Sequence, residues 1–433
     1  MRVDSVATRQ FQPKPALTPP SGRRGPLGWA AQNLFRTPLD ACLTVVSVAS
    51  IAFFSVVIFE WAVTEAVWEA DSRRECLDHS PAGACWAGVR AWWSAFMYGR
   101  YTEVERWRVD AGLVLVVMVF IPMWWSRLRA RLAYLSTVAL ALPPVLGYLF
   151  LGGERVWWFH GLFTLAVVAL LDCGWRASRV VLSVHHPVRE PTPRSRALVL
   201  LFLAVLVSLV TADWSLEKVG TNLWGGMFLT LLIALVGVAA SVPVGIALAL
   251  GRRSSMSLLR AIIIAYIELL RSVPFITVLF MVVTMTPLFL PVALNPDKLA
   301  LALLGIALFS SAYMAEIVRG GLQAVPAGQF EAARSVGLRY WSMMRWVVLP
   351  QALRHMIPNI ASSFIGLLKD TTVVALIGLY DFSRMLNAPG SHPTWIGLHI
   401  ETFVLGGVVY FLMCYSMSKY SRHLERQLDP QSR

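Results

Sequence analysis

Long uncharged, apolar runs constrain the fold of this chain more than any other feature of its sequence. A helix of about 20 residues crosses a bilayer, and slightly shorter runs suffice when flanking side chains reach the interface. Because backbone groups in lipid must pair within the protein, such runs fold as helices. Ten runs free of Asp, Glu, Lys and Arg qualify: 41–59, 111–126, 132–153, 156–171, 197–212, 219–251, 272–296, 299–315, 355–368 and 402–418. The sequence therefore predicts an all-α polytopic membrane protein with about ten transmembrane helices.

The composition supports this fold class and excludes others. Charged residues make up 15% of the 433 residues, against about 25% in soluble domains. A soluble enzyme, a disordered chain and a coiled coil are therefore disfavoured. The net charge of +13 is interpreted as cationic loops held on one side of a bilayer, with no nucleic acid as partner.

The distribution of Lys and Arg predicts the orientation of the chain. The polar, Pro-rich tail 1–40 has no signal-type apolar region and is interpreted as a cytoplasmic extension. If every span then crosses, the inside segments carry 26 of the 38 Lys and Arg residues. This asymmetry follows the positive-inside rule and places both termini in the cytoplasm.

The chain divides into two halves of different character. Residues 41–212 hold five spans of low polarity and one long polar loop, 64–110, predicted to be periplasmic. Residues 213–425 hold five more, rich in Gly, Pro and intramembrane charge, and 426–433 form a cytoplasmic tail. The run 219–251 is longer than one span needs, so we expect a periplasmic lead-in before its helix.

Motifs for enzyme chemistry and metal binding are missing from the sequence. None of the five lysines follows a glycine, so the chain has no phosphate-binding loop of the GKS or GKT type. We expect neither catalytic residues nor a metal site, and interpret the tandem His185–His186 as solvated. Cys76 and Cys85 share the polar loop 64–110, and the spacing alone leaves open whether they form a disulfide.

The segment 315–354 contains a break between two predicted short helices. Gly320 and Gly321 are expected to end the preceding span, and Pro326 suits the first turn of a new helix. Gly337 permits the left-handed turn that ends this helix, before a second one over 339–348. Such a helix pair either lies on the membrane surface or docks a cytoplasmic partner.

The same segment carries the motif EAA-x3-G-x9-[I/V]-x-LP. It resembles the EAA loop of ABC importer permeases, here 326–350, and is matched by Glu331, Ala332, Ala333, Gly337, Val347, Leu349 and Pro350. The stretches 266–276, 312–333 and 364–382 are similar to the polar amino acid (HisM-like) branch of that family. The extra N-terminal half and its long loop resemble the larger permease subunit of general L-amino acid transporters, the AapM/BztC type.

This resemblance implies a permease domain of the type I fold in the inner membrane of a bacterial cell, and a set of partners. Two permease subunits, here a heterodimer, would pair with two ATPase subunits and a periplasmic amino acid-binding protein. ATP and Mg²⁺ would bind the ATPase, and this chain would hold no cofactor. Glu331, Ala332, Ala333, Gly337, Leu349 and Pro350 would couple ATP hydrolysis to transport. The alternative is a stand-alone secondary amino acid transporter, although 41–212 shows no counterpart of the broken helices in the second half.

Charges within the membrane are candidates for the substrate pathway, because they are costly and mark function. Glu268 and Arg271 lie one helical turn apart and can equally form a local ion pair. A zwitterionic amino acid needs both signs of charge, and the resemblance adds Ser310 and Asp370 as residues that face the pore. Many relatives have Asn where this chain has Ser310.

Overall fold

The computed structural model describes residues 29–30, 33–124, 146–147, 149–152, 216–291 and 296–428. The predicted spans 156–171 and 197–212 lie outside these ranges, as do His185, His186 and most of the span 132–153. Backbone contacts divide the chain into two compact units. One contains residues 1–70 and 75–86, and the other contains residues 71–74 and 87–433.

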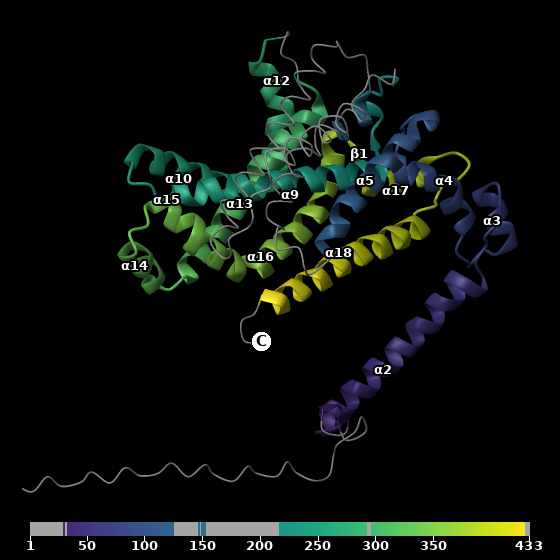
Figure 1. Ribbon diagram of the computed structural model, residues 1–433. Helices are drawn as coiled ribbons and strands as arrows, with labels where there is room; N and C mark the ends of the chain where they lie inside the picture. Colours follow the sequence, from purple (N-terminus) through teal and green to yellow (C-terminus); the bar gives the residue numbers. More distant parts are fainter. Residues whose placement is uncertain are drawn as a thin grey trace, which may run out of the picture. The chain divides into compact units, whose positions relative to one another are not determined.

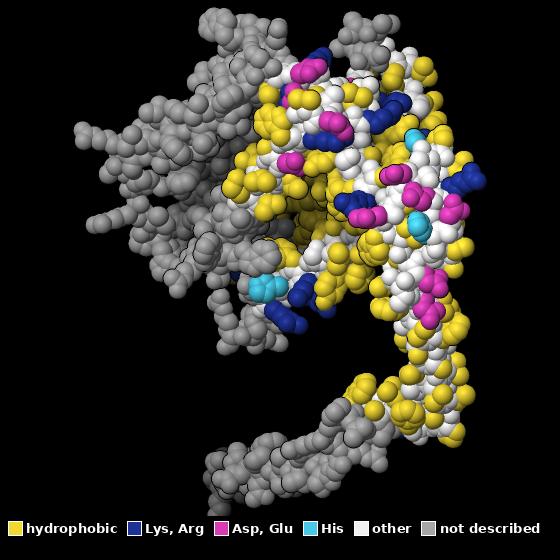
Figure 2. All heavy atoms as spheres, turned by 90° about the vertical axis from the view of Figure 1, so that its right-hand side faces the viewer, with side chains coloured by type: hydrophobic (Ala, Val, Ile, Leu, Met, Phe, Trp, Pro, Cys, Tyr) yellow, Lys and Arg dark blue, Asp and Glu magenta, His cyan; other side chains and the backbone are white. Residues whose placement is uncertain are grey.

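The first unit contains one long apolar helix, α2 (Pro38–Phe59). Thr37 caps it: its hydroxyl accepts a hydrogen bond from the Asp40 N–H, and the Asp40 carboxylate accepts one from the Thr37 N–H. A π-helical turn (Glu60–Thr64) extends the helix. No described residue of α2 is buried, and hydrophobic side chains cover its surface (Figure 2). This surface suits contact with lipid and matches the predicted span 41–59.

A disulfide closes the polar loop that follows α2. Cys76 of α3 (Arg73–His79) is bonded to Cys85, with the two Cα atoms 5.8 Å apart. Cys85 pairs through its backbone with Val67, and the Trp86 indole donates to the Ala62 carbonyl at 2.8 Å. The loop is thus folded back onto the end of α2.

The second unit is a bundle of long helices (Figure 1). Central α13 (Lys298–Ala324) packs against both α9 (Gly226–Gly251) and α16 (Leu349–Asp370), and α16 also packs against α18 (Ile400–Leu428). Further helices are α4 (Trp86–Tyr98), α5 (Arg106–Trp124), α10 (Ser257–Ser272), α11 (Phe275–Phe280), α12 (Thr286–Phe289), α14 (Ala327–Ser335), α15 (Tyr340–Met343) and α17 (Phe382–Asn387).

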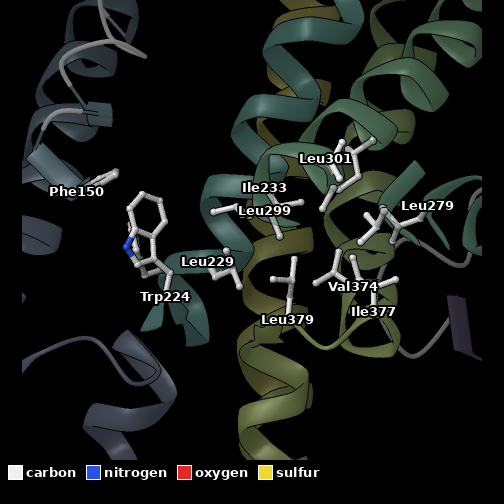
Figure 3. Close-up of a cluster of buried hydrophobic side chains, with 14 of the residues drawn as sticks. Phe150, Trp224, Leu229, Ile233, Leu279, Leu299, Leu301, Val374, Ile377 and Leu379 are labelled. Atoms are coloured by element: carbon white, nitrogen blue, oxygen red, sulfur yellow. The ribbon is translucent and has the colours of Figure 1, made fainter. Parts of the chain in front are cut away.

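Two apolar clusters hold this bundle together. One lies between α9, α13 and the segment after α16, where Ile233, Leu299 and Val374 meet (Figure 3). The other joins α13 to α14, α15 and α16 through Met314, Ala333, Met343 and Met356. The second cluster is the base on which the EAA segment rests.

Five helical segments in the described part of the chain are long and apolar enough to cross a membrane: Pro38–Thr64, Gly226–Gly251, Lys298–Ala324, Arg354–Ile377 and Ile400–Arg426. A sixth span would be the pair Ser257–Ser272 and Phe275–Phe289, bent by 110°. The bend lies at Val273 and Pro274, at the start of the predicted span 272–296, and the helical stretch Phe275–Phe289 falls within that span. Val273 is extended ahead of Pro274, as expected for a residue before proline, so the helix breaks there.

The helix end predicted at Gly320 and Gly321 is wrong, because α13 continues to Ala324. A Cβ on Gly321 would lie 2.2 Å from Met356 Cγ of α16. Gly321 therefore allows α13 and α16 to approach closely instead of ending the helix. The predicted second short helix likewise has no end of its own, since α15 runs through a π turn (Met344–Val348) directly into α16.

The predicted lead-in before α9 is present and joins three distant parts of the chain. Thr221–Leu223 form a 3-10 turn, and Gly225 and Gly226 pair with Tyr380 and Asp381 of the short strand β1 (Tyr380–Asp381). Gly99 pairs with Trp224 on the other side. A Cβ on Gly99 would lie 2.3 Å from the Gly225 Cα, so only glycine fits this crossing.

Asp381 begins α17 beside this crossing and is fully buried. Its carboxylate accepts hydrogen bonds from the Ser383 and Arg384 N–H groups, both at 3.1 Å. Burial nevertheless raises the pKa of the Asp381 carboxyl to about 6. Thr230 of α9 caps the neighbouring position, because its hydroxyl accepts from the Phe382 N–H at 3.0 Å.

Candidate functional site

The EAA residues lie on α14, a short helix that Pro326 precedes. Ala333 is buried in the cluster with Met343, Met344 and Val348, while Glu331 and Ala332 are exposed. The Gln351 amide donates to the Gln329 side chain at 3.0 Å and ties α14 to α16. The helix therefore packs against the bundle through Ala333, and Glu331 and Ala332 remain exposed.

A left-handed turn ends α14, as the sequence predicts. Gly337 has a φ of +79°, and the Leu338 N–H donates to the Ala333 carbonyl at 3.1 Å. The turn exposes apolar side chains, with Val336 80% and Trp341 70% exposed. Leu349 and Pro350 follow at the start of α16, where proline suits the first turn. Exposed apolar groups around a fixed turn are typical of a protein contact surface.

Glu316 of α13 is the centre of a charged network that the sequence reasoning missed. Its carboxylate accepts from Arg252 at 2.5 Å and from Arg319 at 2.8 Å, and it lies 3.6 Å from the Arg271 guanidinium. Arg252 also contacts Glu268 at 3.3 Å. We call Arg252, Glu268, Arg271, Glu316 and Arg319 the Glu316 network. It joins the ends of α9 and α10 to α13.

Glu268 and Arg271 therefore do form ion pairs, but not with each other: Glu268 pairs with Arg252, and Arg271 pairs with Glu316. Glu316 ends the uncharged run 299–315 and looked like a boundary in the sequence. The signal that could have found it is Arg319, three residues further on the same helix.

The structure does not bring the four predicted substrate-pathway residues together. Ser310 is only 7% exposed, and its hydroxyl donates to the Ile306 carbonyl at 2.6 Å, within its own helix. Asp370 is exposed at the end of α16 opposite to Leu349. Only Glu268 and Arg271 share a site.

A cavity of about 500 Å³ opens beside the Glu316 network, between α13 and α16. Glu316, His355 and Asn359 supply its polar groups, and Gly320 and Gly321 line it without side chains. His355 and Asn359 were not expected from the sequence, because they lie in or beside the uncharged run 355–368 and carry no formal charge. Among the described residues, no three His, Cys, Asp or Glu side chains are grouped to hold a metal.

Comparison with known proteins gives matches over the whole chain. The model of the family described as "Binding-protein-dependent transport system inner membrane component" matches residues 241–429. The inner membrane amino-acid ABC transporter permease protein YhdY of Escherichia coli is 36% identical over 403 residues, 93% of this chain and 92% of that protein.

Two further relatives differ in length. The glutamate/glutamine/aspartate/asparagine transport system permease protein BztC of Rhodobacter capsulatus is 33% identical, with 98% of each chain covered. The probable glutamine ABC transporter permease protein GlnP of Bacillus subtilis is 32% identical over 47% of this chain and 92% of its own. The chain is thus similar to long permeases throughout and to a short permease over about half its length.

Proposed function

The chain belongs to the family of binding-protein-dependent transport system inner membrane components, and we propose that it is the permease subunit that carries polar and general L-amino acids through an ATP-driven importer. It is a transport subunit and not an enzyme. The resemblance to the long permeases of the AapM/BztC type, expected from its layout, is confirmed by the match to BztC over 98% of the chain.

The observation that carries the coupling mechanism is the exposed EAA helix α14 on its buried Ala333. In the proposal, α14 enters a cleft of an ATPase subunit, where Glu331 and Ala332 make the contact. Gly337 fixes the turn, and Leu349 and Pro350 begin α16, so movement of α14 passes into a helix of the membrane bundle. ATP and Mg²⁺ bind the ATPase, whose closure drives this movement.

Permeases of ABC importers work with ATPase and substrate-binding protein partners. We propose in addition a second permease subunit that forms a heterodimer with this chain. Both termini and the EAA segment then face the cytoplasm, and the disulfide-closed loop faces the periplasm, where a disulfide persists. This orientation is supported by the distribution of Lys and Arg in the sequence.

The substrate pathway in this proposal includes Glu268, Arg271, Ser310 and Asp370. Glu268 and Arg271 belong to a network that offers both signs of charge, as an amino acid zwitterion requires. Ser310 contributes as a packing residue, since its hydroxyl is already bonded within α13. Asp370 supplies an exposed carboxylate at the other end of the bundle.

A tagged full-length chain, purified in mild detergent, tests the function. We expect a second permease and an ATPase to co-purify, and a periplasmic amino acid-binding protein loaded with substrate to stimulate ATP hydrolysis. A chain that purifies alone and transports amino acids in liposomes without ATP would instead establish a secondary transporter.

A further inference from the structure

A second pocket, of about 290 Å³, lies beside the Glu316 network and shares Arg252 and Arg319 with it. Its lining is Arg252, Arg253, Arg319 and Gln323, without a carboxylate. These residues come from the C-terminal end of α9 and the last turns of α13. The pocket therefore presents guanidinium and amide donors to whatever occupies it.

The charges around this pocket do not balance. Four arginines (Arg252, Arg253, Arg271 and Arg319) surround two carboxylates, Glu268 and Glu316. Glu316 is only 12% exposed and is not part of the pocket lining. Among the described acidic residues none pairs with Arg253, which is itself exposed. An excess of positive charge thus faces the opening.

The surroundings of the pocket place it at a membrane surface. It opens where α9 leaves its span and α10 begins, and the side chains of Met256 just before α10 and of Leu258 and Ile262 within it are exposed. Large exposed apolar side chains next to arginines match an environment of acyl chains below and phosphates above. Arg253 also stacks over the Phe330 ring of α14, at 5.7 Å from the ring centre. The pocket is therefore in contact with the EAA helix.

We propose that this pocket binds the phosphate of an anionic phospholipid headgroup, with Arg253 and Arg319 as the main donors. The headgroup neutralises the excess charge, and Arg253 connects it to Phe330 and so to α14. This inference rests on the proposed function only for the side of the membrane that the pocket faces.

Lipid-dependent thermal unfolding of the purified full-length chain in detergent tests the site without ATPase or substrate. The probes are phosphatidylglycerol, neutral phosphatidylcholine and inorganic phosphate. Arg253→Gln removes the unpaired guanidinium. Gln323→Glu keeps the acceptor that Arg319 contacts at 3.2 Å but adds a negative charge to the pocket. Arg260→Gln is the matched control, because Arg260 is an exposed arginine of α10 outside the pocket lining.

We expect phosphatidylglycerol, but not phosphatidylcholine, to raise the unfolding midpoint of the unmodified chain and of the Arg260→Gln variant alike. The half-saturating concentration should rise about fivefold in Arg253→Gln, as expected for one basic side chain near an anionic surface, and at least as much in Gln323→Glu. Equal half-saturating concentrations in all four proteins would overturn the site. An equal midpoint shift with inorganic phosphate alone would overturn the lipid as its ligand and identify a free anion.

Because lipid binding is read without transport, the site and the proposed function can fail separately. If the ATPase does not co-purify but the pocket variants weaken lipid binding, the lipid site is supported and the importer assignment is wrong. If the importer assembles but the variants leave lipid binding unchanged, the importer assignment is supported and the lipid site is wrong.

Discussion

Gly337 and Gly328 separate two effects that a glycine can have on α14. An added Cβ would meet no atom within 4 Å at either position. Gly337, however, has a φ of +79°, whereas Gly328 lies within the regular helix. Any difference between equal substitutions at the two sites therefore reports backbone conformation and not crowding.

We predict that Gly337→Val abolishes coupling while the chain still inserts and purifies. A β-branched residue at this φ costs about 1–3 kcal/mol, so the turn after α14 should relax and move the EAA helix. Substrate-stimulated ATP hydrolysis by the reconstituted importer measures this loss, and Gly328→Val serves as the control that keeps it. Full stimulation in Gly337→Val would argue against α14 as the coupling element.

Glu316→Gln should be far more damaging than Glu268→Gln. Glu316 is a buried acceptor for Arg252 and Arg319, with Arg271 nearby, and its neutralisation should lower the free energy of unfolding by about 2–3 kcal/mol. Glu268 is 57% exposed with one contact at 3.3 Å, so its loss should cost about 0.5 kcal/mol. Thermal unfolding in detergent compares the two, and equal losses would contradict a network centred on Glu316.

Asp370→Asn should raise the substrate concentration needed for half-maximal stimulation of the ATPase. The exposed carboxylate can bind the ammonium group of an amino acid, and the amide keeps the shape but not the charge. Titration of the loaded binding protein gives the measurement. An unchanged concentration dependence would assign substrate binding to the second permease subunit.

At the scale of elements, the buried Asp381 at the start of α17 should make the free energy of unfolding depend on pH. The folded-state pKa of Asp381, about 6, lies above the ordinary value of 3.8, because burial penalises the carboxylate. The carboxyl therefore contributes its full stability below about pH 4, and this contribution is lost as the pH rises through about 6.

We predict that Asp381→Asn flattens this dependence. Asparagine still caps the helix but does not titrate. For the unmodified chain the loss between pH 4 and pH 7 should reach about 2 kcal/mol, measured as the shift of the unfolding midpoint in detergent. The same slope in both proteins would show that another group is responsible.

The sequence predicted helices well where one uncharged run corresponds to one helix. It predicted them poorly where a helix contains charged residues, so that the uncharged run does not mark its ends. The runs 41–59, 299–315 and 402–418 all lie inside longer helices of the structure. By contrast, Arg260, Glu268 and Arg271 kept α10 out of the predicted spans, because these were defined as runs without charge and α10 is an amphipathic helix that carries charges. The coupling motif was found because its spacing is local, whereas the Glu316 network joins three helices and leaves no local pattern.

At the scale of the whole molecule, Arg108 fastens α5 to the C-terminal half of the chain. It is fully buried, and its guanidinium donates to the Glu217 carbonyl at 2.7 Å and pairs with Glu105. Nearby, the Tyr101 hydroxyl donates to the Phe150 carbonyl at 2.8 Å. These bonds connect segments that are far apart in sequence.

Arg108→Gln should therefore loosen this attachment and lower the free energy of unfolding by about 3 kcal/mol, since it leaves the largely buried Glu105 carboxylate and the Glu217 carbonyl poorly paired. Arg106→Gln is the control, because Arg106 pairs with Glu103, whose side chain is exposed. Limited proteolysis and thermal unfolding in detergent should both distinguish the variants. Equal behaviour of the two would show that Arg108 is not the fastening residue.

The crossing of Gly99, Gly225 and β1 has a consequence for how the protein is made. Ribosomes deliver these segments in order, so the partners of Gly225 and Gly226 in β1 (Tyr380–Asp381) emerge only after most of the helices have been inserted. Until then the backbone groups of Gly225 and Gly226 lack their partners, and the junction that also holds Gly99 of the N-terminal half is incomplete. A chain that stops before β1 would therefore keep this junction open, with the backbone groups of Gly225 and Gly226 left without these partners.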